Sequence, residues 1–254
     1  ADKSLQDIPM PAVAQAASCP TKASMPSSGE MKAIARAAQD RGLLWRVSNG
    51  GRESWLYGTS HVGRRTWLVP GRTVMEAMGK ADKLALELNV MDPEVVKGIA
   101  QGMKARDDAP ELEAALAARL QVQRDKACAQ DIAVLRPDAQ VIALQAMSAR
   151  GQGVYPDYGV DMLLAGMAAG LKKPVVGLET PELQIRELFS DDPQEVAESV
   201  DDGLKQLEKG KASEQVHLIA LGVVQHPLVP AVVDGLPHGA HALEAADGGR
   251  VADD

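Results

Sequence analysis

Short apolar runs alternate with stretches of helical periodicity along most of the chain. Residues 43–48 and 54–57 are rich in strand-forming side chains, and they predict two strands. The Asn-Gly pair at 49–50 predicts a hairpin turn between them, because both residues tolerate positive φ. Residues 84–88 and 175–178 are apolar runs of the length of buried strands. The pattern therefore predicts at least four short strands.

Helical periodicity and end signals account for most of the remaining chain. Thr180 and Pro181 form a typical helix start, with Thr180 as the N-cap and Pro181 in the first turn. Helices are expected over residues 31–39, 73–80, 160–171, 193–209 and 212–221, and with breaks over 92–149. Because strands and helices alternate, the sequence predicts an α/β protein with a small mixed β-sheet, an N-terminal β-hairpin and many helices.

Composition divides the chain into three parts. Residues 1–30 are rich in Ala, Pro and Ser, which is typical of a flexible leader. Residues 31–221 carry the periodic pattern and are expected to form the domain. Residues 222–254 contain no Lys and a single Arg, are dense in Gly, Pro and Ala, and predict a loop or disordered tail.

The charge balance and the apolar runs exclude some classes of function. The formal net charge is −8, which argues against nucleic-acid binding because phosphate recognition needs a basic surface. No apolar run approaches the roughly 18–20 residues that a membrane-spanning helix needs. No integral membrane segment is therefore expected.

The N-terminus and the cysteines leave the cellular compartment open. The chain begins at Ala1 without Met, as a mature product would after removal of a signal peptide, or as a deliberately shortened chain would. Cys19 and Cys128 would be two separate thiols in a reducing compartment, or one bridge in an oxidising compartment. Their spacing does not decide between these alternatives.

His61 is the first candidate for chemistry. It is the only histidine before residue 217, and it follows the second predicted strand through Gly58, Thr59 and Ser60. Loops at strand ends carry binding groups in α/β folds, and a histidine there could ligate a metal or transfer a proton. A histidine that caps a turn or packs in the core explains the local sequence equally simply.

Two glutamates follow apolar strands and could act beside His61. Glu87 ends the run at 84–88, where a carboxylate is costly to bury unless it is paired or liganded, or where it simply points to solvent. Glu179 follows the run at 175–178 and precedes a helix N-terminus, where the helix dipole already favours an acid. Gln184, one turn into that helix, could point the same way or lie on the surface.

Basic and histidine residues elsewhere carry weaker signals. Arg64 and Arg65 could bind an anionic substrate or the carboxylates, although such pairs are more often solvated. The late histidines are His217, His226, His238 and His241. Residues 235–238 match Gly-x-x-His by letter, but no predicted strand precedes them, so the match carries little information.

Four blocks of sequence, in order, resemble the TraB/GumN family, to which the Tiki-type metalloproteases are related. They include Trp45-Arg46-Val47, the block from Ser54 to Gly63 with its Gly-x-x-His, residues 81–88 with Gly159-Val160-Asp161 further on, and residues 173–184. The resemblance covers residues 43–188. It implies a fold similar to erythromycin-esterase-like and ChaN-like proteins.

The resemblance also implies site residues and chemistry. His61 corresponds to the histidine of the first Gly-x-x-His, Glu87 to the glutamate of the following strand, and Glu179 and Gln184 to the Leu-Glu-Thr…Gln segment. Tiki-type members hydrolyse peptide bonds with a divalent metal, manganese or cobalt. The family's second Gly-x-x-His has no convincing counterpart after residue 222, which predicts an aberrant or truncated C-terminus, such as a frame change would produce, and weak activity.

Two functions remain as expectations. The first is a metal-dependent hydrolase of peptide or protein substrates. In it His61 binds the metal, Glu87 is a metal ligand or general base, Glu179 is a supporting carboxylate, and the substrate is bound by Arg64, Arg65 and Gln184. The second is a non-catalytic, exported binding protein. A haem-binding module follows only by analogy with ChaN. We expect a periplasmic or secreted protein with a Cys19–Cys128 disulfide, and His61 and Glu87 facing one cleft from neighbouring strands.

Overall fold

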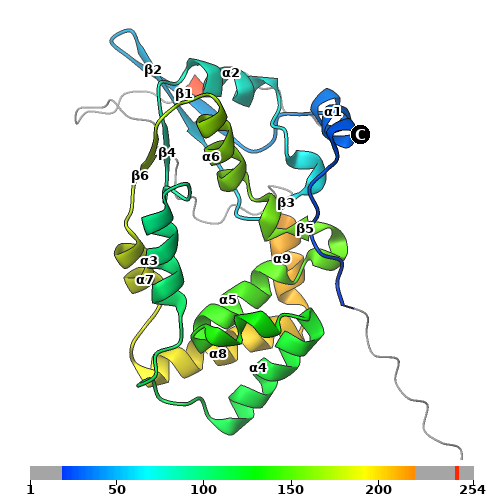
Figure 1. The fold of residues 1–254 in the computed structure, drawn as a ribbon, viewed down its shortest axis with the longest axis vertical. Coiled ribbons are helices and arrows are strands. Elements are labelled where there is room, and N and C mark those ends of the chain that lie inside the picture. Colours follow the sequence, from blue (N-terminus) through cyan, green and yellow to red (C-terminus); the bar gives the residue numbers. More distant parts are fainter. Residues whose placement is uncertain (1–18, 221–243, 246–254) are drawn as a thin grey trace, which may run out of the picture.

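The computed structural model describes residues 19–220 and 244–245, with small sheets towards one end and a group of helices at the other (Figure 1). The helices are α1 (Ser28–Arg36), α2 (Arg72–Lys80), α3 (Pro93–Met103), α4 (Ala114–Ala127), α5 (Pro137–Met147), α6 (Val160–Gly170), α7 (Pro181–Leu188), α8 (Pro193–Glu208) and α9 (Lys211–Ala220). Short 3₁₀ helices are η1 (Arg65–Trp67), η2 (Gln130–Val134), η3 (Arg150–Gln152) and η4 (Pro156–Tyr158). The strands are β1 (Leu44–Asn49), β2 (Arg52–Tyr57), β3 (Gly63–Arg64), β4 (Leu84–Leu86), β5 (Val154–Tyr155), β6 (Val175–Gly177) and β7 (Glu244–Ala245).

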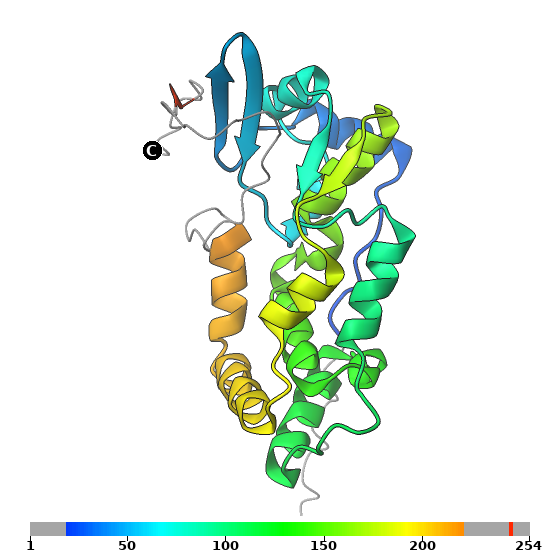
Figure 2. The ribbon, with the colours of Figure 1, turned by 90° about the vertical axis from the view of Figure 1, so that its left-hand side faces the viewer.

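The predicted hairpin stands at one end of the molecule (Figure 2). β1 and β2 pair antiparallel, and Asn49 is the last paired residue of β1, opposite Arg52. The turn is therefore Gly50-Gly51, one residue later than predicted, and both glycines have positive φ, 56° and 81°. Such a turn matches the twist of the strands it joins. Along its other edge β1 pairs with β7, which falls inside the segment predicted as loop or tail.

The sheets are smaller and more separate than the single mixed sheet expected. Within the described residues their orders are β2-β1-β7, β3-β5 and β4-β6, and only the last pair is parallel. The α/β class is confirmed. A core of β4, α2 and α6 forms around the parallel pair, and its buried members are Val74, Met78, Leu84, Leu86, Leu164, Ala165 and Ala168.

A second core lies between the helices of the other end. Its buried members come from α4, α5 and α8 and from Ala129: Leu120, Ala129, Val141, Leu144, Val200 and Leu204. Gly203 lets α8 approach α5 closely, because a Cβ there would lie 2.1 Å from Cγ1 of Val141. α3 and α7 lie side by side between the two ends (Figure 1), where Gly102 faces Ile185.

Helix boundaries follow local capping. α1 begins at Ser28, before the predicted residue 31, because Ser27 caps it and Glu30 completes a capping box. Asp92 caps α3, and Pro93 occupies its first turn. The predicted helical stretch 92–149 is divided into α3, α4, η2 and α5.

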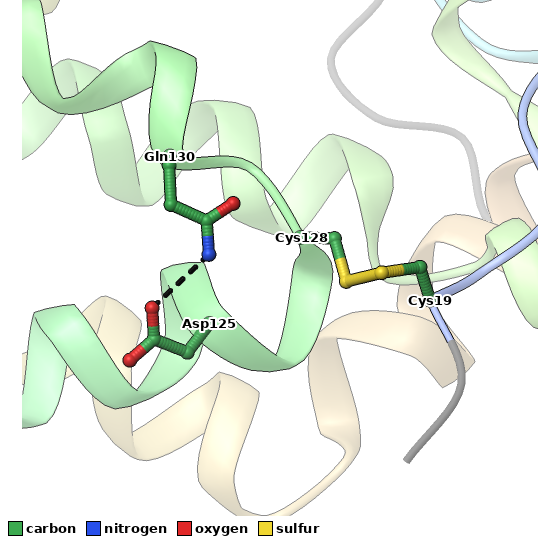
Figure 3. The surroundings of a disulfide bond; sticks show 4 residues. All are labelled: Cys19, Asp125, Cys128 and Gln130. Atoms are coloured by element: carbon green, nitrogen blue, oxygen red, sulfur yellow. Dashed lines mark hydrogen bonds between the residues drawn. A yellow bond between two sulfur atoms is a disulfide. The ribbon is translucent and has the colours of Figure 1, made fainter. Parts of the chain in front are cut away.

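Cys19 and Cys128 form a disulfide, which confirms the expected bridge (Figure 3). Their Cα atoms lie 5.7 Å apart, and 109 residues separate them in sequence. Cys128 ends α4 in a left-handed conformation, with φ of 49°. The bridge therefore ties the first described residue of the chain to the helical end of the molecule.

Across the described ranges, no helix combines the length and the apolar character needed to cross a bilayer.

Candidate functional site

The loop after β2 presents His61 at the surface. The amide of Gly58 still donates to the carbonyl of Leu43, so the hairpin pairing extends to the start of the motif (2.9 Å). Beyond it the chain turns towards β3, and the His61 side chain is 78% exposed. The histidine is therefore accessible to a ligand, and it is not a core histidine.

Asp161 holds one side of the imidazole ring. Its Oδ2 lies 2.7 Å from Nδ1 of His61, and its side chain is 19% exposed. Asp161 is the second residue of α6 and also accepts a hydrogen bond from the Thr59 side chain. Two members of the Gly-x-x-His loop thus converge on one carboxylate.

Glu87 holds the other side of the ring. It directly follows β4, and its Oε2 lies 3.5 Å from Nε2 of His61. The Glu87 side chain is 26% exposed. The imidazole therefore lies between two carboxylates, one at each nitrogen. His61 and Glu87 lie together, as expected, but the expectation that they come from neighbouring strands is wrong, because β2 and β4 belong to different sheets in the described part of the chain.

The carboxylates set the charge of the site. The hydrogen bond to Asp161 and then that to Glu87 raise the pKa of His61 to about 10, against the opposing effect of burial. Burial raises the pKa of Asp161, but the hydrogen bonds from His61 and Thr59 and the charge of His61 together keep it below its usual value. Without a ligand the imidazole is consequently a cation at neutral pH, placed between the carboxyl groups of Asp161 and Glu87.

Two glycines allow the His61 loop and the start of α6 to touch. A Cβ on Gly159 would lie 2.8 Å from the carbonyl oxygen of His61, and a Cβ on Gly63 would lie 2.1 Å from that of Tyr158. The amide of Val160 donates to the Ser60 carbonyl across this contact (2.8 Å). The close backbone approach brings Asp161 within reach of His61.

Glu179 lies beside Glu87 through the parallel β4–β6 pairing. Its amide donates to the carbonyl of Glu87 (2.9 Å), one step beyond the pairing of Leu86 with Gly177. The Glu179 side chain is half-buried and forms no hydrogen bond or ion pair with any described residue. Gln184 lies in α7, and its side chain likewise has no polar contact within the described segments.

Arg64 and Arg65 are directed to other partners. Arg65 forms a two-pronged salt bridge with Glu30 (2.8 and 2.9 Å) and donates from Nε to the carbonyl of Ser24 (3.1 Å). Arg64 donates to the carbonyl of Gln152 (2.9 Å), and its Nη2 lies 3.4 Å from Nδ1 of His217. Neither arginine contacts Glu87 or Glu179 in the described residues.

Asp161 is the site residue that the local sequence pattern does not single out. An acid in the first turn of a helix is usually explained by the helix dipole alone. Its one signal is its place in the Gly159-Val160-Asp161 block, which carries part of the family resemblance. The late histidines His226, His238 and His241 lie outside the described residues.

The described side chains fit a divalent cation only as an incomplete ligand set. Ligand bonds of about 2.0–2.2 Å place neighbouring donors of one ion about 3 Å apart, close to the 3.5 Å between Nε2 of His61 and Oε2 of Glu87. A carboxylate on the other nitrogen, as Asp161 supplies, is the usual support of a metal-binding histidine. No group of three converging donors is found in the described part of the chain.

A separate cavity of about 830 Å³ lies between α3, α7 and the start of α8, and His61 does not line it. Its walls carry Arg136, Ile185 and Phe189. Arg136 already binds Asp138 and stacks on Phe189, with its Cζ 4.9 Å from the ring centre. The arginine is therefore engaged within the fold.

Comparison with known proteins gives the family. The model of the TraB/PrgY/gumN family matches residues 43–221, and the chain belongs to this family. No curated protein and no solved structure gives a significant match. The resemblance inferred from the Gly-x-x-His block and the later segments is thus confirmed at the level of the family.

Proposed function

We propose that this protein is a metal-dependent hydrolase of peptide bonds in which Nε2 of His61 and a carboxylate oxygen of Glu87 bind the metal. The observation that carries the proposal is the imidazole held between Glu87 and Asp161 on an exposed loop. The likeness of the motif to Tiki-type metalloproteases supports the peptide bond as substrate and manganese or cobalt as metal. A bound divalent ion would lower the pKa of a coordinated water and supply a nucleophile.

Each side chain has a distinct role in this proposal. Asp161 keeps the proton on Nδ1, which leaves Nε2 directed towards Glu87. Glu87 is ligand or general base, and Glu179 is a supporting carboxylate attached through the backbone to the same strand pair. Ligation requires neutral His61, so binding must release the proton from Nε2.

The Cys19–Cys128 disulfide supports the proposal that the protein acts in an oxidising compartment, either the periplasm or the exterior of the cell. Disulfide bonds persist where cytosolic reductants are absent. Titration of free thiols in denatured protein taken directly from its native source tests this. No reactive thiol is expected, and two reactive thiols would contradict it.

Hydrolysis of a peptide library by the purified full-length chain tests the proposed reaction. Cleavage should require added Mn²⁺ or Co²⁺, stop with a chelator, and fall at least about a hundredfold in Glu87→Gln, as loss of a general base does. Glu111→Gln, at an exposed glutamate, serves as the matched control and should leave the rate unchanged. Cleavage that survives both the chelator and Glu87→Gln would refute the proposal.

A non-catalytic binding protein is the second candidate. It is favoured by the finding that no group of three His, Cys, Asp or Glu donors converges within the described residues, whereas catalytic metal sites usually supply about three protein ligands. The library distinguishes the two candidates: peptides retained without cleavage, in a manner that Glu87→Gln abolishes, would support binding alone.

A further inference from the structure

Residues 19–30, here called the N-terminal strap, run along the molecule from its helical end to the sheet end (Figure 1). The strap is anchored at Cys128, where α4 ends, and leads into α1. Pro20 lines a small cavity with α4 and α5 side chains, so the strap also packs against the helical end. Because the strap contacts both ends of the molecule, it can hold distant parts of the chain together.

Ser24 is the point where the strap meets the site-bearing segments. Its amide donates to the Tyr158 hydroxyl (2.8 Å), and that hydroxyl donates to the Ser24 carbonyl (2.7 Å). The same carbonyl accepts a hydrogen bond from Nε of Arg65 (3.1 Å). One backbone residue of the strap thus binds two side chains that come from different segments.

A second contact lies further along the strap. Both terminal nitrogens of Arg65 donate to the carboxylate of Glu30, in the first turn of α1. Such a paired arrangement fixes the orientation of the guanidinium as well as its distance. Arg65 is therefore held to the strap at two places, Ser24 and Glu30.

Arg65 and Tyr158, the two residues that bind the strap, lie close in sequence to the site residues. Arg65 lies four residues after His61, and Tyr158 lies three residues before Asp161. Tyr158 is buried, with 4% exposure, so its hydroxyl is fixed in direction. The strap consequently bridges the loop that carries His61 and the helix start that carries Asp161.

We propose that Arg65 and Tyr158 are positioning residues. Through them the disulfide-anchored strap keeps the side chains of His61 and Asp161 within hydrogen-bonding distance of each other. This gives Arg65 a task other than the substrate contact expected from sequence. The consequence for metal binding rests on the proposed function. The positioning itself is independent of it and concerns the metal-free protein.

Amide hydrogen exchange of the metal-free full-length chain tests the positioning. The reporter is the Val160 amide, which donates to Ser60 across the contact between the two segments. Tyr158→Phe removes only the hydroxyl that binds Ser24, and loss of these hydrogen bonds should speed exchange at Val160 about tenfold. The amide of Leu204, in the second core, reports global opening and should change much less.

Tyr155→Phe is the matched control. Tyr155 is buried next to Tyr158, with ring centres 5.3 Å apart, but its hydroxyl forms no hydrogen bond in the described part of the chain. The Tyr155→Phe substitution should therefore leave hydrogen exchange at the Val160 amide unchanged. Equal acceleration at Val160 and Leu204 in Tyr158→Phe, or no acceleration at Val160, would overturn the proposal.

A spectroscopic readout and a second variant separate positioning from plain stability. The His61 Nδ1–H proton, hydrogen-bonded to Asp161, should give a downfield resonance in the wild type that His61→Gln removes and Tyr158→Phe broadens. Cys19→Ser/Cys128→Ser should broaden it as well, and an unchanged resonance in both variants would refute the positioning role. Absence of Co²⁺ binding by the wild type would refute the proposed function and leave these results standing.

Discussion

Oδ2 of Asp161 lies 2.7 Å from Nδ1 of His61, although 100 residues separate the two in sequence. The contact depends on the backbone of the His61 loop touching the start of α6, and the contact leaves Nε2 of the ring facing Glu87. Asp161 therefore orients the His61 ring through Nδ1. Nε2 is left free to bind a metal ion together with the carboxylate of Glu87.

Asp161→Asn should lower the pKa of His61 from about 10 towards the ordinary value of 6.5. The hydrogen bond to Asp161 is the largest cause of the raised pKa, and Asn preserves the shape of the side chain but not its charge. Titration of the metal-free protein by NMR, with His61 assigned through His61→Gln, measures the change. Glu87→Gln should lower the pKa of His61 less than Asp161→Asn does. An equal or larger effect of Glu87→Gln would show that Asp161 is not the main cause of the raised pKa.

The same ion pairs predict how stability depends on pH in the metal-free protein. Because the folded-state pKa of His61 is raised, the stabilisation is complete below about pH 6.5 and is lost as the pH rises towards 10. The effect should be modest, since the side chain is 78% exposed and solvent screens the pairs. Denaturant midpoints from pH 6 to 10 should fall more for the wild type than for His61→Gln; parallel curves would contradict this.

Reduction of Cys19–Cys128 should destabilise the protein by about 4–5 kcal/mol on a chain-entropy model, since 109 residues separate the cysteines. Denaturant unfolding with and without a dithiol reductant measures the difference. The Cys19→Ser/Cys128→Ser variant is the control and should not respond to the reductant. An oxidised and a reduced wild type with the same midpoint would show that the bridge does not constrain the unfolded chain.

Gly63→Ala should cost roughly 1–3 kcal/mol, because the added Cβ would lie 2.1 Å from the carbonyl oxygen of Tyr158 and force the two segments apart. Gly79→Ala is the matched control. It adds the same methyl group inside α2, where nothing lies within 4 Å, and should be neutral or stabilising. Chemical denaturation measures both, and equal effects would contradict the close-approach argument.

The sequence predicts much of the local structure because the signals are local. The hairpin, the start of α3 at Asp92 and Pro93, and the start of α7 at Thr180 all follow from turn and cap residues. The turn is displaced by one residue because two successive glycines, and not Asn-Gly, supply the positive φ. Local preference alone does not distinguish these two positions.

The arrangement of the site depends on contacts that no local signal encodes. Leu86 of β4 and Gly177 of β6, the last pair of the parallel ladder, are 91 residues apart in sequence. The pairing of the two strands places Glu179 next to Glu87. Asp161 resembles any acid of a helix start until tertiary packing places it against His61. Arg65 looks like a solvated basic residue until the strap supplies Glu30 and Ser24.

Equilibrium titration of the metal-free, full-length protein with Co²⁺, followed by its visible absorption, tests the central claim most directly. Binding should release protons, and His61→Gln and Glu87→Gln should each weaken it at least tenfold. His217→Gln, at a histidine placed against Arg64 and not between carboxylates, is the matched control and should bind as the wild type does. Tight cobalt binding that survives both His61→Gln and Glu87→Gln would contradict the account.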